Sequence, residues 1–193
     1  MASDLSTRAL AGSKRLDEAA WIAAAFEALA TEGMAGVRVE RLAATLGVTK
    51  GSFYWHFKDR EALVEAVLER WATGRIAAIA EQTHDHGGQA QARRALLGLL
   101  DIYARTPNRK GLGVELAIRG LAPGHIAAKR AVARVDAARL GKVGALFARL
   151  GKSPAEADAR ALLFYAFLFG QSLMGGGKRL AAAKRAAAKI VAD

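Results

Sequence analysis

Cysteine is absent from the 193 residues of this chain. Its absence excludes a disulfide framework and thiolate chemistry, and it fits a reducing cytoplasm. Long apolar runs are also missing: the most apolar stretch, residues 161–169, is too short for a membrane-spanning helix, which needs about 20 residues. Residues 1–15 contain no apolar segment of the kind that a signal peptide needs. We therefore expect a cytoplasmic protein with no membrane partner.

Patterns that carry catalysis are absent as well. The four histidines are scattered, no nucleophile stands beside a base in a catalytic motif, and no glycine-rich phosphate loop occurs. Two histidines flank an aspartate at 84–86, but a short loop without further ligands is more simply exposed than metal-binding. We therefore expect no catalytic residue, no metal site and no cofactor.

Acidic residues are few: 18 stand against 29 basic ones, which gives a net charge of +11. Excess positive charge favours a nucleic-acid partner through long-range attraction. However, the first 60 residues carry eight basic and seven acidic side chains, whereas residues 61–193 carry 21 and 11. A prediction of DNA binding must therefore rest on a motif and not on the total charge.

Helical periodicity extends over most of the chain, and 52% of its residues are apolar, enough for one sizeable core or two small ones. We predict an all-α protein of about nine helices. The expected helices lie at 17–31, 39–46, 49–57, 59–80, 89–105 and 112–120, in a long segment that ends at 150, and at 153–174 and 178–190. Glycines 33, 47 and 151 are the expected helix ends, and Asp59 and Ser153 are the expected N-caps.

The clearest motif lies at 39–60. Apolar residues of its first helix recur at i, i+3, i+4 and i+7, namely Val39, Leu42, Ala43 and Leu46. Gly47 can close this helix in the left-handed conformation, and Thr49 is a candidate N-cap for a shorter second helix. A helix, a tight turn with glycine and a second helix are typical of the helix-turn-helix, whose second helix lies in the DNA major groove.

The second helix of this motif has a core side and an unusual outer side. Phe53 and Phe57 are one turn apart and define the core side, so Tyr54 and Trp55 face outward. Outward aromatic side chains on so short a helix favour a groove partner, and packing of either on a neighbouring helix is the alternative. We predict that the following residues contact DNA: Arg38, Thr49, Lys50, Gly51, Ser52, Tyr54, Trp55, His56, Lys58 and Arg60.

Each of these contacts has a chemical basis. Gly51 lets the backbone come close to DNA, and the hydroxyls of Ser52 and Tyr54 can donate to phosphates. Lys50 and Trp55 can reach sugar or base edges. Lys58 and Arg60 lie at the start of the next helix, where side-chain charge and free backbone amides both favour a phosphate.

The run GVTKGSFYWHFKDREALVEAV at 47–67 resembles the TetR family of bacterial transcriptional regulators, and the resemblance covers residues 15–70. It implies an N-terminal three-helix DNA-binding domain and a C-terminal helical ligand-binding and dimerisation domain. It also implies a homodimer, most often a repressor, that leaves a palindromic operator when a small-molecule effector binds. We expect a flexible arm at 1–13 and the two domains at 14–60 and 61–193. Arg38 stands where family members often carry a capping Ser or Thr, so it is a candidate phosphate clamp.

Residues 161–169 are apolar on every side of a helix, and a second copy of the chain is the simplest cover for the outer side. In the family that the chain resembles, the last two long helices form the dimer interface. The expected interface residues are therefore Leu163, Phe164, Phe167, Leu168, Leu180 and Ala187.

Candidate effector contacts are aromatic or charged residues on otherwise apolar helices: Trp71, Tyr103, Glu115, Arg119, Phe147 and Tyr165. For each of them, core packing or a surface ion pair is the alternative. Between 105 and 152 there are eleven basic and two acidic residues, which raises the hypothesis of an anionic effector. Two other functional classes stay open: a basic protein that binds DNA without regard to sequence, and an enzyme with a DNA-binding domain.

Overall fold

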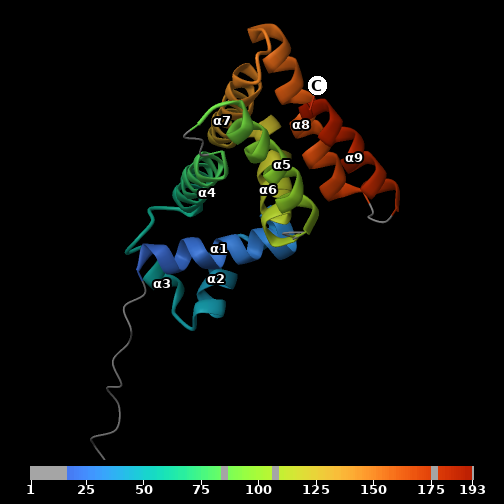
Figure 1. Cartoon of the computed structure of the whole chain (residues 1–193). Helices are drawn as coiled ribbons and strands as arrows, with labels where there is room; N and C mark the ends of the chain where they lie inside the picture. The colour runs from blue at the N-terminus through green and yellow to red at the C-terminus, as the bar shows by residue number, and fades with distance from the viewer. Residues whose placement is uncertain (1–16, 84–86, 106–108, 175–177, 193) are drawn as a thin grey trace, which may run out of the picture.

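The computed structural model describes residues 17–83, 87–105, 109–174 and 178–192. Within these ranges the chain forms nine α-helices and two short 3-10 helices and contains no strand, so the predicted all-α class is confirmed (Figure 1). The elements are α1 (Glu18–Glu32), η1 (Gly33–Gly36), α2 (Val39–Leu46), α3 (Lys50–Phe53), α4 (Arg60–Gln82), α5 (Gln89–Arg105), α6 (Arg109–Leu121), η2 (Ala122–Gly124), α7 (Ile126–Arg149), α8 (Pro154–Leu173) and α9 (Lys178–Ala192). The predicted arm at 1–13 and the loop at 84–86 lie outside the described residues.

Side-chain caps and glycines set several helix ends where the sequence predicts them. The Asp59 carboxylate accepts a hydrogen bond from the Ala62 N–H (2.8 Å), and the Ser153 hydroxyl accepts one from the Glu156 N–H (3.3 Å). Positive φ angles of 64°, 69° and 89° occur at Gly33, Gly47 and Gly151. These starts and stops are confirmed.

Helices α1, α2 and α3 gather at one end of the molecule, and we call residues 17–59 the head (Figure 1). Helices α4 and α6 adjoin the head, α7 and α8 extend to the far end of the molecule, and α9 lies along one side, packed on α5 and α8. The most extensive helix–helix packing joins α7 to α8 and to α4, and α6 packs directly on α1. The head is therefore tied to the rest of the chain through both α4 and α6.

Two apolar cores organise the described chain. The first surrounds Trp21 and joins the head to α4, α6 and the first half of α7 through buried residues that include Phe53, Leu63, Val67, Ile118 and Val135. The second joins α5, the second half of α7, α8 and α9 through Leu96, Leu99, Val143, Phe147 and Leu168, among others. The first core runs across residue 60 without a break, and the domain boundary at that position stays a prediction.

The second helix of the helix-turn-helix is shorter than predicted. It spans Lys50–Phe53 and does not continue as an α-helix to Phe57. Gly51 and Ser52 are poor helix formers, and they account for half of this segment. The Phe57 N–H still donates to the Phe53 carbonyl (3.0 Å), so Phe57 reaches the core from a turn.

Among the described helices, none is both long and apolar enough to cross a membrane.

Candidate functional site

The turn between α2 and α3 fixes the angle of the second helix. Gly47 has φ 69° and ψ 30°, the left-handed conformation, and the Val48 N–H donates to the Ala43 carbonyl (3.0 Å). Thr49 occupies the N-cap position in extended backbone, but its side chain makes no capping hydrogen bond. The predicted N-cap position of Thr49 is therefore confirmed, although its hydroxyl does not cap the helix, and the start of α3 is held by the backbone bond from the Ser52 N–H to the Thr49 carbonyl (3.0 Å).

Four aromatic residues at 53–57 divide into a buried and an exposed pair. Phe53 is fully buried, with its ring 5.3 Å from Trp21 and 5.4 Å from Phe57. Tyr54 and Trp55 are 54% and 87% exposed. The alternative in which Trp55 packs on a neighbouring helix is thereby excluded for the described chain. Around this pair, Gly51, His56 and Lys58 are also exposed, and Ser52 is half-buried.

Two arginines flank the motif and differ in what they contact. Arg38 precedes α2, is exposed and makes no side-chain cap, as expected for a candidate phosphate clamp. Arg60 donates from Nε to the Val37 carbonyl (2.6 Å) and from Nη2 to the Met34 carbonyl (3.3 Å). Arg60 therefore ties the start of α4 to the segment before α2, and its predicted phosphate contact would use the remaining N–H groups of its guanidinium.

A partly buried ion-pair network lies between α6 and α7. Arg139 is 2% exposed and donates from both terminal nitrogens to the Glu115 carboxylate, at 2.6 and 2.7 Å. Arg119 donates to Glu115 (3.1 Å) and also pairs with Asp136 (3.0 Å from Nη1 to Oδ2). Arg75 of α4 stands 3.9 Å from the Glu115 carboxylate. We call Arg75, Glu115, Arg119, Asp136 and Arg139 the Glu115 cluster.

Aromatic rings of α8 cover this cluster. The Arg139 guanidinium lies 4.8 Å from the Phe169 ring centroid and 6.0 Å from that of Tyr165, and the Arg119 guanidinium lies 5.1 Å from Phe169. Burial alone would raise the pKa of Glu115, but the hydrogen bond and charge of Arg139, with the charges of Arg119 and Arg75, hold it below its ordinary value. Glu115 is therefore ionised at neutral pH, and the cluster connects four helices.

The structure thus brings together three predicted effector residues: Glu115, Arg119 and Tyr165. Their partners Arg139, Asp136 and Phe169 are not among the residues predicted from the sequence. One pattern could have revealed Arg139, because it interrupts the apolar stripe of Val132, Val135 and Val143 at helical spacing. A charged residue within such a stripe needs a buried partner.

The other predicted effector residues lie elsewhere. Trp71 belongs to the first core, whereas Phe147 belongs to the second, where its ring is 6.1 Å from Phe164. The Tyr103 side chain lies outside the described residues. On α7, the basic residues Lys129, Arg130, Lys142 and Arg149 are exposed, so most of the described positive charge of this helix faces solvent.

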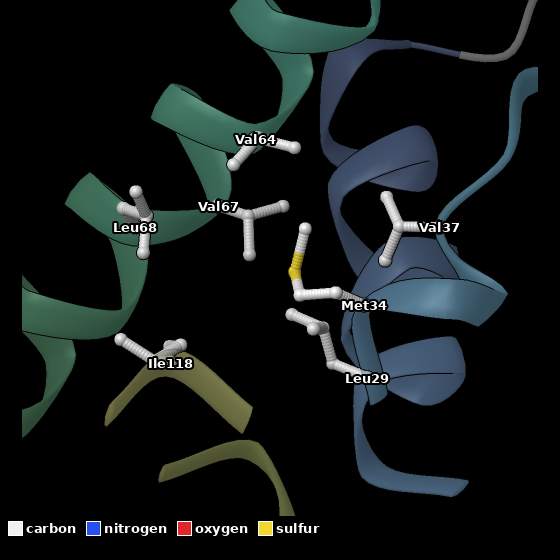
Figure 2. A pocket seen from close by; sticks show the side chains of 7 residues that line it. All are labelled: Leu29, Met34, Val37, Val64, Val67, Leu68 and Ile118. Atoms are coloured by element: carbon white, nitrogen blue, oxygen red, sulfur yellow. The ribbon is translucent and has the colours of Figure 1, made fainter. Parts of the chain in front are cut away.

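A small void lies where the head meets α4 and α6 (Figure 2). It is lined by seven apolar side chains: Leu29, Met34, Val37, Val64, Val67, Leu68 and Ile118. Its volume is about 10 Å³, close to the least that one water molecule needs, and the apolar lining offers no hydrogen bond to hold one. We interpret it as a packing gap at the junction of the head and not as an effector site.

The predicted dimer residues fall into two groups. Phe164, Leu168 and Ala187 are buried in the second core of the single chain, so the prediction for these three is corrected: they have almost no surface left for a partner. Phe167 is half-buried against the same core, whereas Leu163 is 61% exposed. The side chain of Leu180 lies outside the described residues.

Residues 22–67 match the family described as bacterial regulatory proteins, tetR family. The class G tetracycline repressor protein of Vibrio anguillarum is 31% identical over 157 residues, which cover 76% of this chain and 73% of that protein. The class C tetracycline repressor protein of Escherichia coli is 42% identical over 59 residues, 31% of this chain and 27% of that protein. A transcriptional regulator from Saccharomonospora viridis, solved in complex with choline, has a TM-score of 0.74 and 16% identity, with 91% of this chain and 95% of that chain covered.

An all-α chain with a helix-turn-helix head and a larger helical domain has the architecture of a DNA-binding transcriptional regulator. With the match to the class G repressor across most of both chains, the chain belongs to the TetR family of bacterial transcriptional regulators.

Proposed function

We propose that this protein is a homodimeric, sequence-specific DNA-binding regulator, most simply a repressor. The observation that carries the proposal is the split of the aromatic residues at 53–57: Phe53 and Phe57 fill the core, while Tyr54 and Trp55 are turned to solvent. A side chain as apolar as Trp55 gains nothing from exposure in the free protein. In the major groove it can contact base edges, while Tyr54 and Lys58 donate to phosphates.

The proposed dimer would form through the outer face of α8. Leu162 and Leu163 are exposed side by side on this helix, and Leu173 lies exposed further along it. A second copy of the chain across a two-fold axis would cover these side chains. The two heads would then read a palindrome whose half-sites are about 34–36 Å apart, or another whole number of helical turns.

We also propose that a small-molecule effector acts at the Glu115 cluster. This cluster joins α6 and α7 to α4 and to the aromatic rings of α8, so a ligand that rearranges it would shift the helices that hold the head. This mechanism requires that the ligand binds more tightly to the conformation of the protein that does not bind DNA. The regulator from Saccharomonospora viridis, which shares this fold, was solved in complex with a small molecule, choline.

Selection of bound duplexes from a random-sequence library tests the DNA-binding proposal. We expect a palindrome to be enriched by the parent protein and a weaker or different sequence to be enriched by Trp55→Ala. Binding that enriches no sequence and only falls with salt would favour the alternative, a basic protein that coats DNA. The enriched duplex then serves to screen for effectors by release.

A further inference from the structure

Two oppositely charged side chains meet on the outer surface of the helix-turn-helix. The Lys50 ammonium, at the first residue of α3, lies 2.5 Å from the Glu40 carboxylate of α2. Both side chains are largely exposed, and each belongs to a different helix of the motif.

Stability does not explain this pair. Exposed ion pairs contribute little to folding, and the head is already held by the buried core around Trp21 and Phe53. The hydrogen bond to Lys50 lowers the pKa of Glu40, and the hydrogen bond to Glu40 raises the pKa of Lys50, so both groups are charged at neutral pH. Beside a DNA surface, the carboxylate cancels the attraction of Lys50 for phosphates.

We propose that Glu40 is a specificity-determining residue that acts through Lys50, an inference that rests on the DNA-binding function proposed above. In complexes with arbitrary sequences, Glu40 holds the Lys50 ammonium and keeps it from becoming a phosphate contact. At the correct site, Lys50 donates with its remaining N–H groups to the O6 and N7 acceptors of a guanine, and Glu40 accepts from the N4 amino group of the paired cytosine. The ligand of the pair is therefore one G·C base pair in the major groove.

The test compares the parent with Glu40→Gln, Lys50→Gln and the double variant, on a random-sequence duplex and on the duplex enriched from the library. Glu32→Gln is the matched control, because it removes a carboxylate from a second exposed ion pair of the head, the one with Arg41 at 2.5 Å. The measured quantities are Kd and the slope of log K against log salt. Far-ultraviolet circular dichroism of each variant checks that the head is folded.

Glu40→Gln is expected to bind the random duplex more tightly and to steepen the salt slope by about 0.9, because Lys50 becomes one more phosphate contact. Raising salt from about 50 to about 200 mM should then reduce the affinity of this variant about 3.5-fold more than it reduces that of the parent. Adding Lys50→Gln should abolish the change, and Glu32→Gln should not produce it. On the enriched duplex, Glu40→Gln should lose its preference at one G·C position.

The proposal is overturned if Glu40→Gln matches Glu32→Gln on the random duplex, or if its effect persists in the Lys50→Gln background, because the carboxylate would then act without Lys50. Failure of the proposed function has a different signature. In that case the parent shows no preference for the enriched duplex over the random one, while the comparison of salt slopes on random DNA still decides the role of Glu40. A parent that binds neither duplex overturns both.

Discussion

At the residue scale, function in the head is carried by side chains that the fold does not need. Phe53 and Phe57 could be placed in the core from their spacing alone, and the exposure of Tyr54 and Trp55 follows from that placement. The partners of Lys50 and Arg60 could not be predicted in this way. They depend on how α2, α3 and α4 meet in space, and no spacing rule links Glu40 to Lys50 or Arg60 to the Met34 carbonyl.

Trp55→Ala is expected to change which sequences the protein prefers while leaving its stability almost unchanged. The side chain is 87% exposed, so its removal leaves no cavity. Thermal unfolding and library selection, run side by side, check both halves of this prediction. A large fall in melting temperature with an unaltered sequence preference would assign Trp55 to the fold instead.

Lys58→Gln is expected to weaken binding to every duplex about equally and to reduce the salt slope by about 0.9, the value of one phosphate contact. Lys142→Gln is the control, because Lys142 is equally a surface lysine but lies on α7, away from the head. Anisotropy titrations at several salt concentrations measure the slopes. Equal effects of the two variants would mean that Lys58 acts only through the net charge of the chain.

At the element scale, the helix ends were largely predictable and the buried polar contacts were not. Glycines at 33, 47 and 151 and caps at Asp59 and Ser153 act locally, so their pattern is visible in the sequence. The length of α3 and the burial of Arg139 depend on tertiary packing. Burial along α5 and α6 also depends on tertiary packing. Leu97 and Leu116 are apolar but partly exposed, whereas Leu99 and Val114 on the same helices are buried.

Helix α6 touches α1 closely at one glycine. A Cβ at Gly113 would stand 2.8 Å from the Ala30 carbonyl oxygen, whereas a Cβ at Gly74 of α4 would meet nothing within 4 Å. Gly113→Ala should therefore destabilise the protein by about 1–3 kcal/mol through overpacking. Gly74→Ala should stabilise it by about 0.5–1 kcal/mol through helix propensity. Urea unfolding of both variants checks the contrast, and similar effects of the two would mean that α6 does not press on α1.

Glu115→Gln should lower the free energy of unfolding by about 3–5 kcal/mol at neutral pH, because the substitution leaves the buried Arg139 charge without its carboxylate partner. Glu69→Gln is the matched control, since Glu69 also accepts two hydrogen bonds from an arginine, Arg134, but on the surface. We expect Glu69→Gln to lower the free energy of unfolding much less, because an exposed ion pair contributes little to stability.

The acid dependence of unfolding follows from the same residue. The folded-state pKa of Glu115 is lowered, so its stabilising contribution is complete above its unfolded pKa of about 4.3 and is lost as the pH falls through the folded value. The gap in stability between the parent and Glu115→Gln should therefore shrink below about pH 4. Urea midpoints measured from neutral to acidic pH test this, and a gap that does not change with pH would show that the carboxylate charge is not responsible.

At the scale of the whole molecule, the sequence predicts a homodimer, and three of the six predicted interface residues are buried within the single chain: Phe164, Leu168 and Ala187. A helix that is apolar on all sides suggests a partner, yet the pattern does not reveal which side faces the partner. Phe164 and Leu168 turn out to face the chain's own second core, and Leu162 and Leu163 face outward. Only the packing of α5, α7 and α9 around α8 decides between the two sides.

Leu163→Glu is expected to give monomers, because a dimer through the outer face of α8 would bury the new carboxylate. Ile126→Glu is the control: Ile126 is an exposed apolar residue at the start of α7, away from that face. Size-exclusion chromatography with light scattering measures the mass of each. A dimer that survives Leu163→Glu, or is lost equally in Ile126→Glu, would move the interface elsewhere.

In the proposed function, the two heads of a dimer read one palindromic site. Sedimentation of the protein with the enriched duplex, titrated at a concentration well above Kd, measures how many chains bind. We expect two chains on the full palindrome and a large loss of affinity on a duplex with one half-site scrambled. A single chain per duplex, or two chains bound equally well to the intact and the scrambled duplex, would contradict it.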